Sequence, residues 1–216
     1  MAGEKTDSAS VLDVIKAFAR PLRTDRVLPP IPGRPPGAFE ALYAQCPDPW
    51  GVLTSPLAHQ RYLALVEAVA RHSPCQSILD VGCGEGALAR YLVACATEVT
   101  GIDASATAIS RARHLVPKAT FECCTLEAFG TEQRFDVVLA VEVLYYVKCR
   151  NAAIRKLLSL GRSVIVSYTN RERRTLDPIV AEYCPPEERV FHSFFGLKNH
   201  GFTIAHLTGP RSHGSR

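Results

Sequence analysis

Residues 77–89 constrain the fold more than any other stretch of this chain. They read as a short apolar strand, then a turn with glycine at every second position, then the start of a helix. Ile78, Leu79 and Val81 are typical of a strand that is buried on both faces of a parallel sheet. Glycine lets the backbone turn sharply and lets a ligand come close to it. We therefore expect a ligand site where this strand ends.

The glycine spacing alone is compatible with two kinds of ligand. Gly82, Gly84 and Gly86 form a G-x-G-x-G pattern. Ala87 also completes G-x-G-x-x-G/A, the pattern of dinucleotide sites. Asp80 favours the other ligand, because a carboxylate repels a pyrophosphate and attracts a cationic amino acid group. The pattern indicates S-adenosylmethionine, which carries an ammonium and a sulfonium but no phosphate.

Strands and helices alternate through the rest of the chain. We expect strands at 76–81, 98–103, 120–123, 135–141, 163–168 and 202–207, and helices at 56–72, 86–94, 105–116, 151–160 and 176–184. This alternation predicts an α/β fold with a doubly wound, mostly parallel sheet and right-handed crossovers. Ligands of such sheets bind at the carboxyl ends of the strands.

Proline and glycine set the expected domain boundaries. Six prolines and two glycines in residues 21–38 argue against a helix or a central strand there. We therefore expect residues 1–38 to be a flexible Pro/Arg-rich extension, with a short amphipathic helix at 8–20. The domain follows at 39–208, with a helical cap at 39–74, and a flexible tail at 209–216 completes the chain.

Composition narrows the class of protein. The length of 216 residues suits one domain, and 47% hydrophobic with 21% charged residues is ordinary for a soluble globular protein. No apolar run reaches the length of a membrane span, and early acidic residues argue against a signal peptide. The net charge of +4 comes largely from arginines in the tails, so we expect no nucleic-acid partner. The eight cysteines contain no C-x-x-C pair, which predicts reduced thiols in the cytoplasm and no metal site.

Further residues at strand ends complete the expected cofactor site. Asp103 closes the second strand 17 residues after Gly86. In dinucleotide-binding folds an acidic residue at about 20 residues from the glycines holds ribose hydroxyls. Capping of the next helix is the alternative role for Asp103, although Ser105 already occupies the cap position. The full set that we expect to bind the cofactor is Asp80, Gly82, Cys83, Gly84, Gly86, Asp103, Ala104, Leu126 and Glu142.

Several of these motifs resemble a known enzyme family. Residues 39–168 are similar to the core of class I S-adenosylmethionine-dependent methyltransferases, in the glycine turn, in Asp103 and in the strand that begins at Phe135. Residues 48–51 (Asp-Pro-Trp-Gly), the Arg-Tyr pair at 61–62 and residues 142–146 (Glu-Val-Leu-Tyr-Tyr) resemble the NodS-like subgroup. The members of that subgroup methylate the amine of the sugar at the non-reducing end of deacetylated chito-oligosaccharides. The resemblance implies metal-independent N-methylation of an amino sugar or oligosaccharide.

The resemblance also implies roles on the acceptor side. Glu142 is expected to bind or deprotonate the acceptor amine, and Tyr145 or Tyr146 to stack on a sugar or orient the nucleophile. The structural alternative for Glu142 is a solvated or structural carboxylate. For Tyr145 and Tyr146 it is packing of the rings in the core. The remaining residues that we expect to bind substrate are Trp50, His59, Arg61 and Tyr62. The alternative role of Trp50 is to anchor the cap, and the alternative for Arg61 is a surface position without a function.

Two other functions remain open on the sequence, and two more are disfavoured. One is an O-methyltransferase of a sugar or secondary metabolite, and another is a non-catalytic protein that binds S-adenosylmethionine. An adenine-N6 methyltransferase is disfavoured because residues 141–145 lack a Pro-Pro-aromatic turn, and a nicotinamide oxidoreductase is disfavoured by Asp80.

The similarity fades after the fifth strand and nine residues follow Leu207, so a truncated sheet without the usual final antiparallel strand is an alternative. The oligomeric state stays open.

Overall fold

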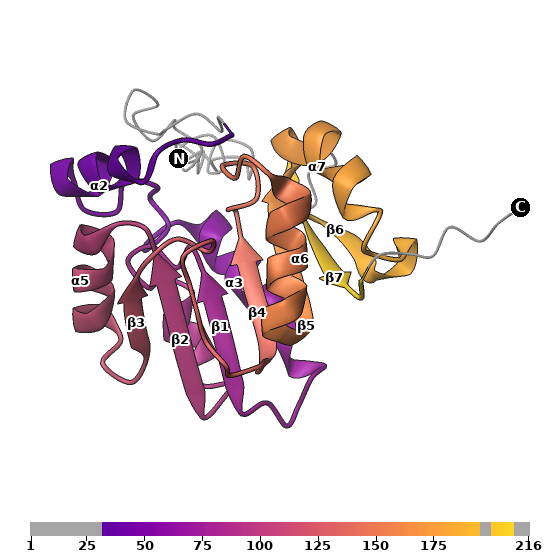
Figure 1. Ribbon diagram of the computed structural model, residues 1–216, viewed down its shortest axis with the longest axis horizontal. Coiled ribbons are helices and arrows are strands. Elements are labelled where there is room, and N and C mark those ends of the chain that lie inside the picture. Colours follow the sequence, from indigo (N-terminus) through magenta and orange to yellow (C-terminus); the bar gives the residue numbers. More distant parts are fainter. Residues whose placement is uncertain (1–31, 195–199, 210–216) are drawn as a thin grey trace, which may run out of the picture.

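The computed structural model describes residues 32–194 and 200–209. In chain order the elements are α2 (Pro36–Gln45), α3 (Pro56–Ala70), β1 (Ser77–Val81), α4 (Ala89–Leu92), β2 (Glu98–Asp103), α5 (Ala106–Leu115), β3 (Thr120–Cys123), β4 (Phe135–Val141), α6 (Arg150–Leu160), β5 (Gly161–Thr169), the 3-10 helix η1 (Asn170–Glu172), α7 (Arg173–Val180), the 3-10 helix η2 (Pro186–Glu188), β6 (Arg189–Ser193) and β7 (Gly201–Leu207) (Figure 1).

The seven strands form one sheet in the order β3-β2-β1-β4-β5-β7-β6. Strands β1 to β5 pair in parallel, whereas β7 is antiparallel to both β5 and β6. The order reverses direction between β1 and β4, where the chain crosses from one half of the sheet to the other. The predicted doubly wound, mostly parallel sheet is confirmed. A crevice for a ligand is expected at this reversal.

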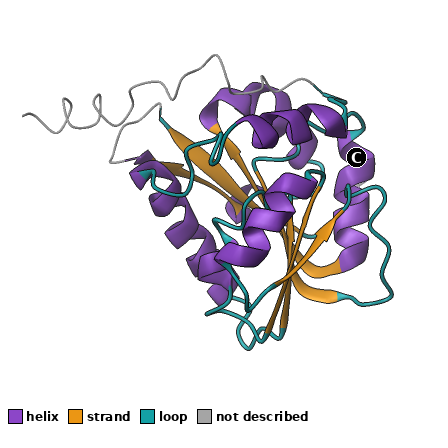
Figure 2. Cartoon of the chain, turned by 90° about the vertical axis from the view of Figure 1, so that its left-hand side faces the viewer, coloured by secondary structure: helices purple, strands orange, loops and turns teal. Residues whose placement is uncertain are grey.

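Helices cover both faces of the sheet, which Figure 2 shows edge-on. Ile78 of β1 is buried in a core with side chains of α3, α4 and α5. Its neighbour Leu79 is buried in a second core with side chains of α6 and α7. Successive strand residues point to opposite faces, so a strand that is covered on both sides needs an unbroken apolar run. This requirement explains why the 77–81 segment was recognisable in the sequence.

Local signals located most elements correctly. The bounds of β2, β3 and β4 are those predicted from the sequence. The hydroxyl of Ser55 accepts a hydrogen bond from the Ala58 amide at 3.4 Å, and the hydroxyl of Ser105 accepts one from the Ala108 amide at 3.1 Å. These bonds cap α3 and α5 as expected. Residues 86–94, by contrast, contain only the short helix α4, and α7 begins and ends a few residues earlier than predicted.

The alternative of a truncated sheet is wrong, because both closing strands are present. β7 matches the predicted strand at 202–207, and β6 was not predicted at all. The two strands approach closely at Gly201, where a Cβ would overlap the carbonyl group of His192. β6 consists of only five residues and directly follows a proline-containing 3-10 helix. Its strand character therefore depends on pairing with β7 more than on its own sequence.

The expectation that residues 21–38 hold no helix is corrected at their C-terminal end. α2 begins at Pro36, inside the stretch that proline seemed to exclude from helices. Proline is well suited to the first helical position, because the amide that it lacks would have no partner there. The Gly33 amide donates a hydrogen bond to the Tyr146 carbonyl at 2.7 Å, so the residues before α2 contact the loop after β4. The rest of the predicted extension with its helix at 8–20, and residues 210–216 of the predicted tail, lie outside the described residues.

The described part of the chain contains no membrane-spanning helix, no group of metal-binding side chains and no disulfide. No helix within residues 32–194 and 200–209 is long and apolar enough to cross a bilayer. No three His, Cys, Asp or Glu side chains in these ranges are grouped so that they could hold a metal ion. The eight cysteines all fall in these ranges and are free thiols.

Candidate active site

A cavity of about 520 Å³ opens at the carboxyl ends of β1, β2 and β4. Its walls come from the glycine turn after β1, from the loops after β2, β3 and β4, and from the cap formed by residues 33–62. Most of the residues predicted for the cofactor and the acceptor line it, namely Trp50, Arg61, Tyr62, Asp80, Gly82, Cys83, Gly84, Asp103, Ala104, Leu126, Glu142, Tyr145 and Tyr146.

Two glycines of the turn are required by the packing around them. Gly82 and Gly84 have positive φ angles of 72° and 54°. A Cβ on Gly82 would overlap the side chain of Val143, and one on Gly84 would lie 2.7 Å from the Tyr43 hydroxyl. The left-handed conformation is costly for other residues. Glycine therefore lets the turn pass beneath the cap and beside the cavity.

Gly86 has a different place from the one predicted, because it does not line the cavity. Its φ angle is 83°, and a Cβ would lie 3.3 Å from the Ala112 Cβ, close to the Phe121 ring as well. Gly86 lets the turn pack on α5 and β3. The residue therefore affects the cavity through the shape of the turn.

Asp80 carries an unusual buried carboxyl group. The residue is 2% exposed in β1, and its Oδ2 atom has no hydrogen-bond partner. Burial, with a smaller contribution from the nearby Asp103 carboxylate, raises the pKa of Asp80 to about 7. Buried polar atoms normally have partners. A cationic group in the cavity would supply the missing one.

Asp103 links the glycine turn to the start of α5. Its Oδ2 accepts a hydrogen bond from the Gly84 amide and its Oδ1 accepts one from the Ser105 amide, both at 2.9 Å. Burial raises the pKa of the Asp103 carboxyl, and these hydrogen bonds oppose the shift. Ser105 provides the side-chain cap of α5, so Asp103 is not needed for that role. The carboxylate is held at the rim of the cavity.

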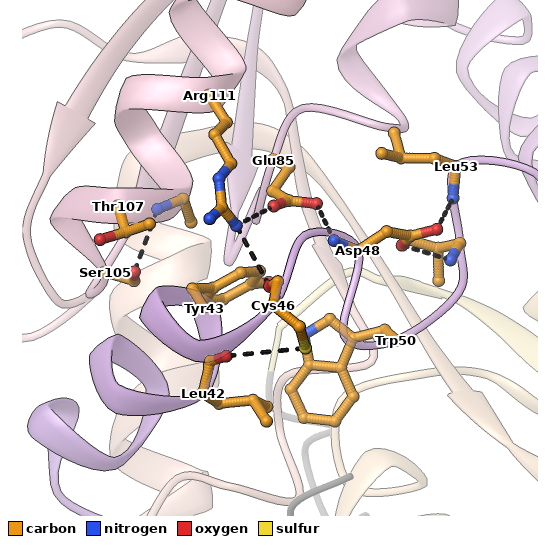
Figure 3. A network of polar contacts seen from close by, with 12 residues as sticks. Leu42, Tyr43, Cys46, Asp48, Trp50, Leu53, Glu85, Ser105, Thr107 and Arg111 are labelled. Atoms are coloured by element: carbon orange, nitrogen blue, oxygen red, sulfur yellow. Dashed lines mark hydrogen bonds and ion pairs between the residues drawn. The ribbon is translucent and has the colours of Figure 1, made fainter. Parts of the chain in front are cut away.

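A network of polar contacts attaches the cap to the glycine turn (Figure 3). The Asp48 amide donates to the Glu85 Oε2 atom at 2.8 Å, and Arg111 of α5 pairs with the Glu85 Oε1 atom at 2.6 Å. The Asp48 carboxylate accepts hydrogen bonds from the amides of Val52 and Leu53. The sequence analysis missed Glu85 and Arg111. Glu85 lies between two glycines of the motif, which is the one signal that could have indicated it.

A second missed residue connects α2 with α5. The Glu40 carboxylate accepts hydrogen bonds from the Thr107 hydroxyl at 2.6 Å, the Ser105 hydroxyl at 2.7 Å and the Thr107 amide at 3.1 Å. These bonds, led by the one from the Thr107 side chain, lower the pKa of Glu40 to about 2. An anionic group is also favoured at a helix N-terminus. No local pattern in the sequence pairs Glu40 with residues 65 positions later.

Glu142 and Arg61 face each other on the opposite side of the cavity. Arg61 Nη1 lies 2.8 Å from Glu142 Oε1, and the two side chains are 12% and 17% exposed. Glu142 Oε2 accepts hydrogen bonds from the Tyr145 hydroxyl at 3.1 Å and the Thr169 amide at 3.2 Å. The φ angle of Glu142 is 58°, which is rare for a residue with a side chain. Such backbone strain tends to occur at functional sites.

Aromatic rings form the wall next to this pair. The ring of Tyr146 packs edge-on against Phe39, with 5.2 Å between the ring centroids. The centroid of Tyr146 lies 4.6 Å from that of Tyr145 and 6.1 Å from that of Trp50. Trp50 also donates from its indole Nε1 to the Tyr43 hydroxyl at 2.9 Å. Trp50 thus both anchors the cap and lines the cavity. Phe39 was missed, because its neighbours in the sequence give no sign of a site.

His59 does not reach the cavity, contrary to the prediction. The side chain is exposed and its Nδ1 atom lies 2.7 Å from the Tyr91 hydroxyl. His59 lies three residues before Tyr62, and both rings pack against the Tyr91 ring of α4. His59 is at the solvent-exposed edge of this face and does not line the cavity.

Acidic side chains outnumber basic ones around the cavity. The lining includes six carboxylates and three basic groups, namely Asp48, Asp80, Glu85, Asp103, Glu127 and Glu142 against Arg34, Arg61 and Lys148. With Glu85 paired to Arg111 and Glu142 to Arg61, the remaining excess of carboxylates suits a ligand with positive charge.

Known proteins are similar in sequence to part of this chain. The nodulation protein S of Bradyrhizobium diazoefficiens is 34% identical over 119 residues, which is 52% of this chain and 57% of that protein. A ubiquinone biosynthesis O-methyltransferase of a Bradyrhizobium species is 33% identical over 115 residues, which is 49% of this chain and 46% of that protein. The matched region thus spans about half the length of these curated relatives.

A solved structure has the same fold. The N-methyltransferase NodS of Bradyrhizobium japonicum WM9, in complex with S-adenosyl-L-homocysteine, superimposes with a TM-score of 0.68 at 21% identity, covering 80% of this chain and 98% of that one. The two chains therefore share the Rossmann-like architecture of class I methyltransferases. The sequence profile of the nodulation protein S (NodS) family matches residues 42–168, which is more than half of the chain and includes most of the cavity wall. This chain belongs to the NodS family.

Proposed function

We propose that the protein is an S-adenosylmethionine-dependent methyltransferase that acts on the amine of a small acceptor, an amino sugar or oligosaccharide. The observation that carries the proposal is the Asp80 carboxyl group, buried to 2% exposure with one oxygen unpartnered beside the cavity. A buried carboxylate without a partner is costly, and a cationic ligand offsets that cost. Phosphate-bearing cofactors would add to the cost.

The residues of the glycine turn and β2 fit this cofactor. When bound, S-adenosylmethionine supplies a methyl group attached to a positively charged sulfur. Asp80 would hold its ammonium group, and Asp103 would accept hydrogen bonds from the ribose hydroxyls. Leu126 and Ala104 provide apolar surface for the adenine at the end of β2 and β3. Gly82 and Gly84 let the turn backbone lie against the ligand, which a Cβ at either position would disturb.

The opposite side of the cavity fits an acceptor with a positive charge and an apolar face. Sugar rings commonly stack on aromatic side chains through their C–H faces, and ammonium groups are attracted to aromatic rings. Trp50 and Tyr146 provide such a surface, and Glu142 provides a carboxylate next to it. An ammonium acceptor must lose a proton before its nitrogen can attack, so a carboxylate at this position is useful.

The chain contributes to catalysis chiefly by positioning. Orienting two reactants in line can supply roughly 7–11 kcal/mol of the barrier. The cap closes one side of the cavity through Tyr43, Trp50 and the Asp48–Glu85 hydrogen bond. Water is thereby kept from the space in which acceptor and methyl donor meet.

O-methylation is the second candidate, because a relative at 33% identity is a ubiquinone biosynthesis O-methyltransferase. The two reactions differ in what the acceptor must offer. Only a free amine can be N-methylated, whereas an acetylated amino sugar keeps its hydroxyl groups.

Two measurements test the proposal. The first is titration calorimetry of S-adenosyl-L-homocysteine on the wild type, on Asp103→Ala and on the surface variant Arg162→Ala. We expect binding by the wild type and by Arg162→Ala, and a loss of more than about 1 kcal/mol for Asp103→Ala. No binding by the wild type would overturn the assignment of the cofactor.

The second measurement is methyl transfer to a panel of glucosamine oligomers and their N-acetylated forms. We expect methylation of the free amines alone. Methylation of both forms would favour O-methylation. Tight binding of the cofactor with no turnover of any acceptor would favour a non-catalytic protein.

A further inference from the structure

The carboxylate of Glu142 is held by donors from three different elements. Arg61 comes from α3, Tyr145 from the loop after β4, and Thr169 from the end of β5. The backbone is fixed as well, because the Glu142 amide donates to the Ser167 carbonyl at 2.9 Å. A side chain with this many restraints has little freedom to rotate. The carboxylate therefore keeps one orientation toward the cavity.

This arrangement leaves capacity for one more hydrogen bond. An ionised carboxylate offers about four lone-pair positions to donors. Tyr145 and Thr169 both bond to Oε2, whereas Oε1 is ion-paired with Arg61 but accepts no hydrogen bond, and Glu142 lines the cavity. The free position is available to a donor inside the cavity. An acceptor amine is such a donor.

Arg61 is already engaged, which changes the role predicted for it. Its guanidinium is paired with Glu142 and lies 5.9 Å from the centre of the Phe202 ring. A buried pair loses much of its stability when one partner is removed, because the other charge stays behind. Arg61 is thus better placed to hold Glu142 than to bind the acceptor itself.

The groups that surround Glu142 determine its charge. Arg61 is the basic group that faces it, and Tyr145 and Tyr146 are the titratable groups from its own loop. β5 contributes the Thr169 amide and β7 the uncharged Phe202 ring. Burial raises the pKa of Glu142, and Arg61 is the largest influence in the opposite direction. Burial also raises the pKa of Tyr145, so that its hydroxyl remains a donor.

We propose that Arg61 and Tyr145 are positioning residues, which keep the Glu142 carboxylate ionised and oriented so that its one free position receives a hydrogen bond from the acceptor amine. This inference rests on the proposed function for the identity of the acceptor. It does not require the acceptor for the relation between Arg61 and Glu142. The two can therefore be tested separately.

The first test measures the Glu142 carboxyl group directly and needs no acceptor. Carbon-13 NMR of glutamate side-chain carboxyls is recorded against pH for the wild type, Arg61→Lys and Arg61→Met, with Glu142→Gln to assign the signal. We expect the pKa of Glu142 to rise by one pH unit or more in Arg61→Met and by less in Arg61→Lys, which keeps the charge. Arg162→Met is the matched control, because its pair with Asp136 is on the surface at 3.6 Å, and it should leave the signal unchanged. An unchanged pKa in Arg61→Met would overturn the inference.

The second test follows kcat/KM against pH with S-adenosylmethionine and a fully deacetylated glucosamine tetramer. The acid limb should move to higher pH in Arg61→Met, by the shift that NMR gives, and return toward the wild type in Arg61→Lys. The titration of the amine itself contributes equally in all variants. Tyr145→Phe should lower kcat with little change in cofactor affinity. A raised KM with an unmoved acid limb would mean that Arg61 binds the acceptor, and would contradict the proposal.

The outcomes distinguish this inference from the proposed function. Should Arg61→Met not fold, Arg61→Lys and Tyr145→Phe still report on the carboxylate. If the pKa of Glu142 shifts in Arg61→Met but no amine is methylated, the proposed acceptor is rejected and the role of Arg61 is retained. If amines are methylated normally but the pKa of Glu142 does not shift, the acceptor is retained and the role of Arg61 is rejected.

Discussion

The backbone amide of Asp48 donates a hydrogen bond to the Glu85 carboxylate over 2.8 Å, across 37 residues of sequence. This bond joins the cap loop to the turn that carries the glycines. Glu85 is 6% exposed, and its other oxygen pairs with Arg111. One carboxylate thereby connects the cap, the turn and α5. The position of the cap over the cavity depends on it.

Glu85→Gln should weaken this connection. Hydrogen bonds and ion pairs to a buried charged group are worth more than neutral ones, so we expect the free energy of unfolding to fall by about 1–3 kcal/mol. Affinity for S-adenosyl-L-homocysteine should fall as well, because the turn loses its support. Urea unfolding and calorimetry measure the two effects. Arg162→Gln, which breaks an exposed pair, should change stability by less than about 0.5 kcal/mol. Equal effects of the two substitutions would argue against a structural role for Glu85.

Gly84→Ala should destabilise the turn through backbone and contact together. The φ angle of 54° costs other residues about 1–2 kcal/mol, and the new Cβ would lie 2.7 Å from the Tyr43 hydroxyl. We expect lower stability in urea and weaker binding of S-adenosyl-L-homocysteine. Gly130→Ala is the control, since no atom lies within 4 Å of its Cβ position. The double variant Gly84→Ala/Tyr43→Phe should recover only part of the loss. Full recovery would place the whole effect in the contact with Tyr43.

Asp80→Asn should have opposite effects on stability and on binding. The pKa of Asp80 is raised to about 7 from its usual 3.8, so the folded state holds a proton that the unfolded state releases. Without ligand, stability should therefore fall as pH rises from about 4 to 7, by at most roughly 4 kcal/mol for the full shift. Asp80→Asn removes this loss, so the variant should be more stable than the wild type at pH 8 and equal to it below pH 4.

The same substitution should weaken binding of S-adenosyl-L-homocysteine by more than tenfold, about 1.4 kcal/mol, because the carboxylate no longer meets the ammonium. Urea unfolding across the pH range, together with calorimetry at pH 8, checks both statements. A variant that binds as well as the wild type would remove Asp80 from the cofactor site.

Glu40→Gln should alter stability in the opposite pH range. The pKa of Glu40 is lowered from 4.5 to about 2 by hydrogen bonds from Thr107 and Ser105. A lowered pKa stabilises the folded state above pH 4.5, and that contribution is lost as pH falls from 4.5 to 2. The variant should thus be less stable than the wild type at pH 7, with the difference vanishing near pH 2. Glu98→Gln, on an exposed residue of β2, is the control in thermal unfolding. A difference that persists at pH 2 would point to packing instead of charge.

The success of the sequence analysis followed from local patterns. The apolar run of β1, the glycine turn and the end of β2 each depend on residues that are close in the chain. Parallel strands then place their carboxyl ends together, which brings Asp80, Asp103 and Glu142 to one cavity without further information. The position of these carboxylates at the cavity was predictable for this reason. Gly86 and His59, which were also expected at the site, do not line the cavity.

The doubly wound sheet, the glycine turn at the cavity and the carboxylates at the strand ends follow from local patterns, because periodicity and turn chemistry depend on residues close in the chain. The remaining features depend on tertiary packing. The strand β6 exists through pairing with β7, and the Glu40, Glu85 and Arg61 contacts join residues 26 to 81 positions apart. Such contacts lie within a few ångströms only after the cap has packed on the sheet. The choice of partner for a buried charge is made by that packing, which no local pattern specifies.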